Sequence, residues 1–307
     1  MRLVFMGTPA FAVPSLEGLA EAGHQLAGVF SQPDKPVGRH HNKLQPTPVK
    51  ERALARGIPV YQPETLRDGT ALTILQELAP ELIVVAAYGR FLPDEILALP
   101  PKGCINVHSS LLPKYRGSAP INWAILNGER VTGVTIQRMV REMDAGDIIL
   151  QRSTPIGETE DAAALYDRLA RLGGELAVEA VAQIQAGTAA YTPQDHTRAT
   201  QAPMLSKAMS PVDWTRSAQE NFNQIRGLYP WPGASTTAIT GEPIKLWGAQ
   251  VVEKHTDATP GAIIAASKQG IDVACGDFMT LRILELQAPG KKRMSAAAYL
   301  AGHPIQV

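Results

Sequence analysis

The chain has 307 residues, of which 45% are hydrophobic and 19% are charged, and its formal net charge is zero. This length suggests about two domains of ordinary size, and the composition is that of an ordinary globular protein with enough apolar residues to build a core. Zero net charge excludes a globally basic nucleic-acid binder, so any contact with nucleic acid must come from a local patch.

The number of cysteines and the length of the apolar segments indicate in which cellular compartment the protein is expected. There are two cysteines, Cys104 and Cys275, far apart and without neighbouring ligands. This pattern predicts neither a zinc site nor a disulfide framework and fits a reducing cytoplasm. No apolar run approaches the ~20 residues needed to span a bilayer, and the N-terminus shows no signal-peptide pattern. We therefore expect a cytoplasmic, monomeric protein without a metal ion and without membrane contact.

The first half of the chain alternates predicted strands and helices, which is typical of an open α/β sheet. A strand at 3–6, a helix at 14–22 and a strand at 25–30 begin the series. The first strand is followed by Gly7-Thr8-Pro9-Ala10, which lacks the Gly-x-Gly-x-x-Gly fingerprint and so disfavours a dinucleotide site. The remaining elements are expected as helices at 49–56, 68–78, 93–99, 119–126 and 161–185, and as strands at 58–61, 81–87, 133–139 and 148–152, with a further strand that starts at Cys104 and carries Asn106 and His108.

A long polar connection, SQPDKPVGRHHNKLQPTP, separates the strand at 25–30 from the helix at 49–56. Connections of this length inside compact domains are usually functional or disordered. Between Asp34 and Arg56 there are six Lys or Arg residues against two acidic ones, together with His40 and His41. The segment therefore predicts a local basic patch, with a solvated polar excursion as the alternative.

The second half of the chain has a different composition. The segment 189–205 is polar and carries proline, which indicates a linker between domains. Beyond it we expect a helix at 218–228 and five short strands, at 234–239, 244–252, 261–266, 270–274 and 279–286. Short strands at this spacing predict a small closed or partly closed barrel.

The residues best suited to chemistry include two on the strand that starts at Cys104. Asn106 and His108 stand two apart, so on a strand they point to the same face. An amide donor, an imidazole and the carboxylate of Asp144 are sufficient parts for an acyl-type transfer. The alternatives are a polar strand end for the first two residues and a turn-forming role for Asp144, just ahead of Gly146.

The run CINVHSSLLPKYRG, with MDAGDI further on, resembles the folate-dependent formyltransferases. That resemblance implies a Rossmann-like domain that uses 10-formyltetrahydrofolate, with Asn106, His108 and Asp144 as the catalytic set. Asn106 and His108 would stabilise the oxyanion of a tetrahedral intermediate. Asp144 would orient His108 and assist water-mediated proton removal from the attacking amine. The segments SLLP and YGRFL would line the folate site, which implicates Ser110, Leu111, Leu112, Pro113, Tyr88, Gly89 and Leu92.

Three further segments, FMGTPAFAVPSLEGL, VFSQPDKPVGR with KLQPTPVK, and YPWPGA, are similar to the members of this family that act on initiator methionyl-tRNA. The resemblance implies that the second domain is an OB-like barrel and that Arg39 and Lys43 contact the acceptor end of the tRNA. The candidates for phosphate contacts in the second domain are Lys207, Lys245, Lys291, Lys292 and Arg293. From Ser206 onward ten basic residues face eight acidic ones, so an ordinary solvated surface stays open for each of them.

The long loop departs from the family pattern at one point. The family usually shows Gly-Arg-Gly-Lys-Lys-Leu, whereas this chain has Gly38-Arg-His-His-Asn-Lys-Leu44, one residue longer. Arg39 matches the loop arginine of the family, whereas His40 and His41 bear on the fine geometry of the loop and on the pH dependence of tRNA binding, because histidine can titrate near neutrality.

Together these features predict an α/β fold, with a Rossmann-like doubly wound sheet domain over 1–188, a linker over 189–205 and a smaller OB-like β-barrel domain over 206–307. The expected function is transfer of the formyl group of 10-formyltetrahydrofolate to the methionyl amino group of initiator Met-tRNA, for translation initiation. Two alternatives stay open at this point. One is a formyltransferase acting on a sugar nucleotide, and the other is a non-catalytic RNA-binding protein.

Overall fold

The computed structural model of the chain describes every residue except 38–42 and 307. Contacts within the chain divide it into two compact units, which are described separately below. The N-terminal unit comprises Met1–Pro120, Val131–Pro155 and Tyr166–Ala202, and the C-terminal unit comprises Ile121–Arg130, Ile156–Leu165 and Pro203–Val307.

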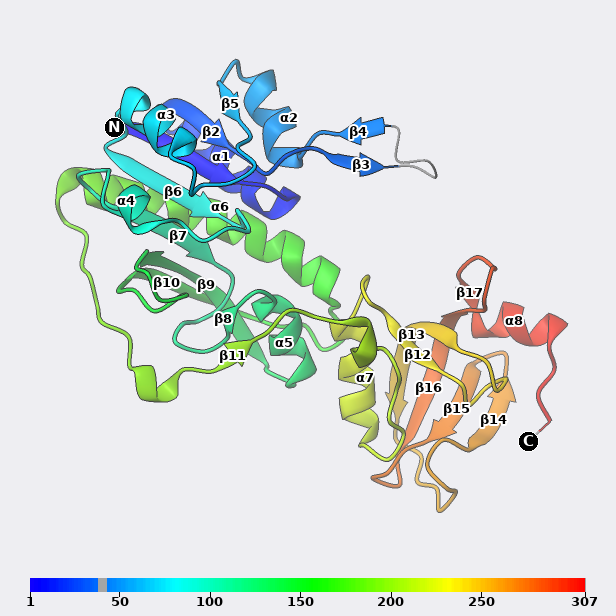
Figure 1. Ribbon diagram of the computed structural model, residues 1–307. Coiled ribbons are helices and arrows are strands. Elements are labelled where there is room, and N and C mark those ends of the chain that lie inside the picture. Colours follow the sequence, from blue (N-terminus) through cyan, green and yellow to red (C-terminus); the bar gives the residue numbers. More distant parts are fainter. Residues whose placement is uncertain (38–42, 307) are drawn as a thin grey trace. The chain divides into compact units, whose positions relative to one another are not determined.

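A seven-stranded sheet forms the centre of the N-terminal unit (Figure 1), in the order β10-β9-β7-β6-β1-β2-β5. Neighbouring strands from β5 to β7 run parallel, while β9 is antiparallel to β7 and β10 to β9. The chain leaves β1 in one direction and later returns to its other side at β6, which is the doubly wound arrangement with a switch point between these strands. The strands are β1 Arg2–Gly7, β2 Gln25–Phe30, β5 Val60–Tyr61, β6 Leu82–Ala86, β7 Cys104–His108, β9 Val131–Arg138 and β10 Ile148–Pro155.

Helices cover both faces of this sheet. On one face a hydrophobic cluster joins Val4 and Ile83 of the sheet to Leu75 of α3 and Ile96 of α4. On the other face α6 lies close to α1 and to the sheet, because added Cβ atoms at Gly173 and Gly174 would meet Val107 at 2.8 Å and Pro14 at 2.8 Å. The helices are α1 Val13–Glu21, α2 Pro48–Ala55, α3 Thr70–Leu78, α4 Asp94–Leu97, α5 Pro120–Leu126 and α6 Ala162–Ala186, with α5 and the start of α6 in the C-terminal unit.

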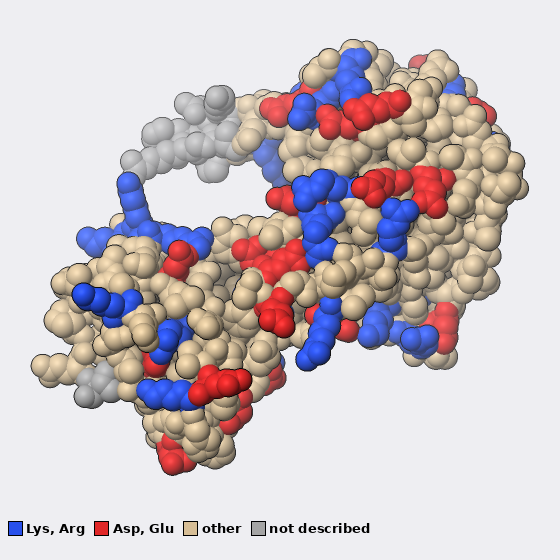
Figure 2. Space-filling model, turned by 180° about the vertical axis from the view of Figure 1, so that it is seen from behind, with Lys and Arg blue, Asp and Glu red and all other residues tan. Residues whose placement is uncertain are grey.

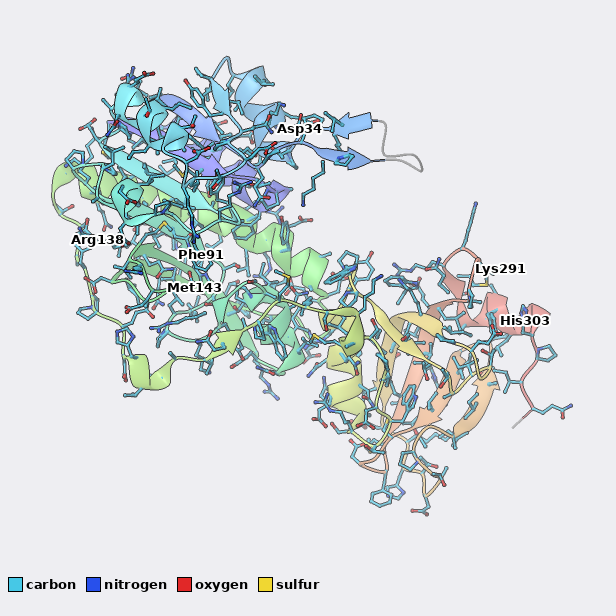
Figure 3. The ribbon with its side chains drawn as sticks, viewed as in Figure 1. Asp34, Phe91, Arg138, Met143, Lys291 and His303 are labelled. Carbon is cyan, nitrogen blue, oxygen red and sulfur yellow. The ribbon has the colours of Figure 1, made fainter. Side chains whose placement is uncertain are left out.

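The predicted long connection contains a hairpin, β3 Lys35–Val37 paired antiparallel with β4 Lys43–Gln45. Asp34 lies at the base of this hairpin (Figure 3) and accepts a 2.6 Å hydrogen bond from Lys50 Nζ and a 2.7 Å hydrogen bond from Gln62 Nε2. These two donors hold the pKa of the Asp34 carboxyl below its usual value. The hairpin is therefore anchored to α2 and to the segment after β5.

The predicted linker at 189–205 contains secondary structure of its own. It includes a short 3-10 helix, His196–Arg198, and strand β11 Gln201–Ala202, which pairs parallel with β8 Arg116–Gly117. Most of this segment thus packs as part of the N-terminal unit, which ends at Ala202.

The C-terminal unit is built on a smaller antiparallel sheet in the order β12-β13-β16-β15-β14, with β17 also paired to β16. Helices α7 Ala218–Gly227 and α8 Ala296–Gly302 pack against it through a hydrophobic cluster that includes Ile225, Leu246, Leu281 and Tyr299. The strands are β12 Ala234–Thr236, β13 Ile244–Val252, β14 Ile263–Ser267, β15 Gly270–Ala274, β16 Thr280–Gln287 and β17 Met294–Ser295.

The predicted fold class, a Rossmann-like α/β domain followed by a smaller β domain, is confirmed. Among the helices of the described residues, none combines the length and the apolar character that crossing a bilayer requires.

Candidate active site

Strand β7 presents Asn106 and His108 on one face of the N-terminal sheet, and every position of the strand except Asn106 is buried. The antiparallel partner β9 places Gln137 opposite Asn106 and Thr135 opposite His108. Directly opposed residues of an antiparallel pair lie on the same face. Four polar side chains from two strands therefore share one part of an otherwise apolar sheet, at the carboxyl end of β7.

His108 is held between two acceptors. Its Nδ1 lies 3.5 Å from Asp144 Oδ1, and its Nε2 lies 2.9 Å from the carbonyl oxygen of Tyr115. A carbonyl oxygen can only accept, so Nε2 carries a proton in this contact, and an ionised carboxylate also only accepts. The two contacts fix the plane of the imidazole and turn its Nδ1 edge toward the Asp144 carboxylate. The 3.5 Å separation is longer than an ordinary hydrogen bond, as is common for catalytic pairs without bound substrate.

Two N–H groups fix the carboxylate of Asp144. Oδ1 accepts from Gln137 Nε2 at 2.8 Å, and Oδ2 accepts from the backbone N–H of Gly117 at 2.8 Å. The residue has a left-handed backbone conformation with φ of 53°, which a residue other than glycine seldom adopts. Hydrogen bonds of this kind suit the ionised form of a carboxylate. The turn therefore aims a negative charge at His108.

Unlike His108 and Asp144, Asn106 has a side-chain amide that is not used in a hydrogen bond within the described part of the chain. The side chain is partly exposed and forms no hydrogen bond with any residue that the structure describes. It can donate to an oxygen of a bound molecule beside His108 and Asp144, whose side chains are only 6% and 11% exposed. This combination of a free donor and a fixed imidazole–carboxylate pair can stabilise an oxyanion and move a proton, as acyl transfer to an amine requires.

Ser110, Leu111, Leu112 and Pro113 form a loop that is tied to β9 and β10. Thr135 Oγ1 donates to Ser110 O at 2.6 Å and accepts from Leu112 N at 3.1 Å. Gln151 Nε2 donates to the carbonyl of Leu112 at 2.7 Å. Leu112 is buried, whereas Leu111 and Pro113 are partly exposed. The loop is therefore rigidly placed directly after His108.

Tyr88 and Gly89 follow β6 and are held by Gln32. Gln32 Nε2 donates to the carbonyl of Tyr88 at 2.9 Å and to that of Gly89 at 3.1 Å. The Tyr88 side chain is buried in the core, which raises the pKa of its phenol. Leu92 and the exposed Phe91 line a cavity of about 530 Å³. The other lining residues are Leu66, Arg67, Gly69, Leu72, Pro93, Asp94, Glu95, Ile96 and Arg141, so Asn106, His108 and Asp144 lie outside it.

The basic residues predicted to contact tRNA fall in several places. Arg39, with His40 and His41, lies outside the described residues, and Lys43 is the first residue of β4. Lys207 is exposed in a 3-10 helix, and Lys292 is exposed before β17.

Lys245, Lys291 and Arg293 come together in the C-terminal unit. Lys245 pairs with Gln287 between β13 and β16, and Gln287 Nε2 donates to the carbonyl of Lys291 at 2.8 Å. Figure 3 shows Lys291 on the connection that leads into β17. Figure 2 shows basic side chains gathered on one part of this unit's surface.

Aromatic rings accompany these cations. The Arg293 guanidinium lies 5.6 Å from the Tyr229 ring centroid and 5.9 Å from that of Trp247, while Lys245 Nζ lies 5.3 Å from the latter. Arg293 also forms an ion pair with Glu285, which offsets part of its charge. We name Tyr229, Trp247, Lys245, Lys291 and Arg293 the basic–aromatic cluster.

Gln137 and Gln194 both hold the Asp144 turn, and neither was predicted from the sequence. Gln137 could have been found, because it is a polar residue that directly follows the apolar Ile136 in a predicted strand. Gln194 gave no such signal, because it stands in a polar segment that was predicted to be a linker. Within the described part of the chain, no group of three or more His, Cys, Asp or Glu side chains is arranged to hold a metal ion.

Comparisons with known proteins match both parts of the chain. Residues 1–181 match the formyl transferase family, and residues 204–304 match the formyl transferase C-terminal domain. The chain is 48% identical over 306 residues to a methionyl-tRNA formyltransferase of Alkaliphilus oremlandii, covering 100% of this chain and 98% of that protein. It is 45% identical over 305 residues to the methionyl-tRNA formyltransferase of Bacillus subtilis, covering 99% and 96%.

Solved structures show the same fold at lower sequence identity. An N-formyltransferase from Helicobacter canadensis, in complex with folinic acid and dTDP-3-aminofucose, matches with a TM-score of 0.69 and 19% identity, covering 92% of this chain and 98% of that one. HypX from Aquifex aeolicus, in complex with tetrahydrofolic acid, matches with a TM-score of 0.63 and 20% identity, covering 98% of this chain and 47% of that one.

Proposed function

Because the chain belongs to the formyltransferase family, with methionyl-tRNA formyltransferases as full-length relatives, we propose that it formylates the amino group of methionine on initiator tRNA. The product is the aminoacyl-tRNA that starts translation. The formyl donor is a folate derivative, as in the rest of the family, and we identify it as 10-formyltetrahydrofolate.

The observation that carries the proposal is the arrangement of His108 and Asp144 beside the free amide of Asn106. These groups supply what a formyl transfer needs and lie at the sheet edge where α/β proteins bind ligands. The amine adds to the formyl carbon, and negative charge develops on the formyl oxygen. Asn106 donates a hydrogen bond to that oxygen.

His108 completes the stabilisation of the oxygen. Its Nε2 proton, which points to the Tyr115 carbonyl without substrate, is shared with the formyl oxygen when substrates are bound and returns fully to Nε2 as the tetrahedral intermediate collapses. Asp144 keeps the imidazole oriented. Two proton transfers accompany the reaction, since the amine loses one proton and N10 of the departing tetrahydrofolate gains one. Asp144 assists the first of these through water.

The folate lies along the loop Ser110–Pro113 and the turn after β6. The hydrogen bonds of Thr135 and Gln151 hold the Ser110–Pro113 loop rigidly, which supports the placement of folate along it. The turn after β6 is supported as a folate contact because Gln32 donates to the carbonyls of Tyr88 and Gly89, and because Leu92 lines a cavity.

The tRNA contacts are the residues around the β3–β4 hairpin and the basic–aromatic cluster. Lys and Arg side chains held against aromatic rings suit a tRNA with unpaired bases. The cations contact phosphates and supply affinity, and the bases stack on the rings. A small sugar acceptor has no use for either feature.

The test is an acceptor assay with radiolabelled formyl on 10-formyltetrahydrofolate. Three acceptors are compared in separate reactions: initiator Met-tRNA, elongator Met-tRNA and a dTDP-aminosugar. We expect label on initiator Met-tRNA at a rate far above the other two. Transfer to the aminosugar alone, or to none of the three, contradicts the proposal.

A further inference from the structure

The segment at residues 192–202, here named the strap, lies between the two parts of the chain that match the family domains, 1–181 and 204–304. At its start Thr192 and Ile148 exchange two backbone hydrogen bonds of 2.8 and 2.9 Å. At its end Ala202 accepts from the N–H groups of Ser118 and Ala119 at 2.9 and 3.1 Å. The strap is thus fastened at one end to the first residue of β10 and at the other to the residues that follow β8.

Gln194 is the point at which the strap meets the catalytic turn, and its side chain is 5% exposed. Its Nε2 donates to the backbone carbonyls of Asp144 at 2.8 Å and Gly146 at 2.7 Å. Its Oε1 accepts from the Arg116 guanidinium at 2.7 Å. Carbonyls only accept and a guanidinium only donates, so a neutral amide in this orientation satisfies all three partners, and neither a carboxylate nor an apolar chain does.

The strap also supports the other contact of His108. Tyr115 N donates to Thr200 Oγ1 at 2.8 Å, and Arg116 N donates to Thr200 O at 2.8 Å. The carbonyl of Tyr115 is the acceptor for His108 Nε2. Both acceptors that hold the imidazole are therefore attached to the same strap, one through Gln194 and one through Thr200.

We propose that the strap is a working part of the active site and that Gln194 is its positioning residue. Gln194 holds the backbone of Asp144 in its left-handed conformation, so that the carboxylate faces His108. The inference rests on the proposed formyl transfer at this site. It assigns a role in the reaction to a segment that composition alone identifies as an interdomain linker.

The decisive variant is Gln194→Glu in the full-length protein. Glutamate keeps the size of the side chain and its acceptor toward Arg116, but it removes both N–H donors to the turn. We expect kcat for Met-tRNA formylation to fall at least tenfold, and about 100-fold if Asp144 moves by about 1 Å. KM for the folate and for the tRNA should stay within about twofold, because neither substrate touches Gln194.

Two controls separate positioning from general damage. Gln185→Glu makes the same chemical change at an exposed position of α6, and Ile83→Val weakens the buried core of β6 without reaching the site. Both should keep the wild-type kcat, even where Ile83→Val lowers Tm as much as Gln194→Glu does. A crystal structure of Gln194→Glu should show the Asp144 carboxylate withdrawn from His108.

The outcomes are distinguishable. Wild-type kcat in Gln194→Glu, or a decrease no larger than that of Ile83→Val at equal Tm, overturns the role of the strap while leaving the function intact. Failure of the wild-type protein to formylate Met-tRNA overturns the proposed function instead.

Discussion

At the scale of single residues, Asn106 and His108 share a strand face but differ in how their hydrogen-bonding groups are used. Both nitrogens of His108 have protein acceptors, whereas the amide of Asn106 has no partner among the described residues. Asn106 is therefore the donor that is ready for substrate, and His108 is the group whose orientation is already fixed.

Replacing Asn106 by leucine should slow the chemical step more than it weakens substrate binding. The substitution preserves size but removes one oxyanion donor, which typically costs about 2.7–4 kcal/mol of barrier, or 10²–10³ in kcat. Steady-state kinetics at saturating folate and Met-tRNA measure this, with Tm as a check on folding. A kcat near that of the wild type would show that Asn106 does not touch the reacting oxygen.

The two cysteines should be inert in the native protein. Burial raises the pKa of Cys104 to about 12 and that of Cys275 to about 11, so both thiols stay protonated at pH 8. Because the thiolate is the reactive form, iodoacetamide should modify neither residue until the protein is unfolded. Intact-mass spectrometry measures the number of alkylated cysteines in the native protein and after denaturant is added. Rapid alkylation of either cysteine in the native state would contradict the buried positions.

The role of a residue could be predicted from the sequence only where it follows from residues close to it in the chain. Asn106 and His108 lie two apart on a strand, and the structure puts them on one face. The partners of Asp144, by contrast, come from positions 117, 137 and 194, which only the folded chain brings together. Side-chain partners at such separations have no local signature.

At the scale of elements, the turn after β6 depends on a glycine that has a close neighbour. Gly89 has φ of 79°, and a Cβ added there would lie 2.5 Å from Gln32 Nε2, the donor that clamps this turn. Gly23 has nearly the same φ, 78°, with nothing within 4 Å. Alanine substitutions at these two glycines therefore differ in one respect. Both introduce backbone strain, but the one at Gly89 also displaces Gln32.

Substituting each glycine by alanine should therefore give different kinetics at similar stability cost. The left-handed conformation costs a residue with a Cβ about 1–2 kcal/mol, so both variants should show a modestly lower Tm. Only Gly89→Ala displaces Gln32, and we expect it alone to raise KM for 10-formyltetrahydrofolate several-fold. If the KM for 10-formyltetrahydrofolate were equal in the two variants, the turn after β6 would not be part of the folate site.

Elements were predictable where apolar periodicity is strong. Strands at 25–30, 244–252 and 270–274 agree with the structure residue for residue, since their apolar runs end at clear turn signals. The hairpin β3–β4 was missed because short polar strands have no apolar face to reveal their pairing. Helix α8 was also missed, although Ser295 before an alanine run is an N-cap signal, and its side chain accepts from Ala298 N.

At the scale of the whole molecule, zero net charge means that attraction to tRNA comes from patches rather than from a global field. The basic–aromatic cluster is one such patch, and Lys292, next to its member Lys291, extends it along the connection to β17. Because phosphate contacts release counterions, binding of tRNA should weaken steeply as salt is raised.

The double variant Lys291→Ala/Lys292→Ala should weaken tRNA binding and flatten its salt dependence. The slope of log K against log salt should fall by about one for each lysine that binds a phosphate in the wild type. Lys268→Ala provides the control, since that lysine is exposed in the same unit between β14 and β15. Filter binding or anisotropy at about 50 to 200 mM salt measures both slopes. Identical slopes for the double variant and the control would place the tRNA elsewhere.

The central claim, that the His108–Asp144 pair transfers a formyl group to Met-tRNA, is tested most directly by single-turnover transfer with both substrates bound. Wild-type protein and Asp144→Asn are each mixed with labelled 10-formyltetrahydrofolate and initiator Met-tRNA at saturating concentrations. We predict rapid label transfer by the wild type and a rate about 10²–10⁴-fold lower in the variant, with binding of both substrates retained. Equal rates in the two proteins would contradict the account.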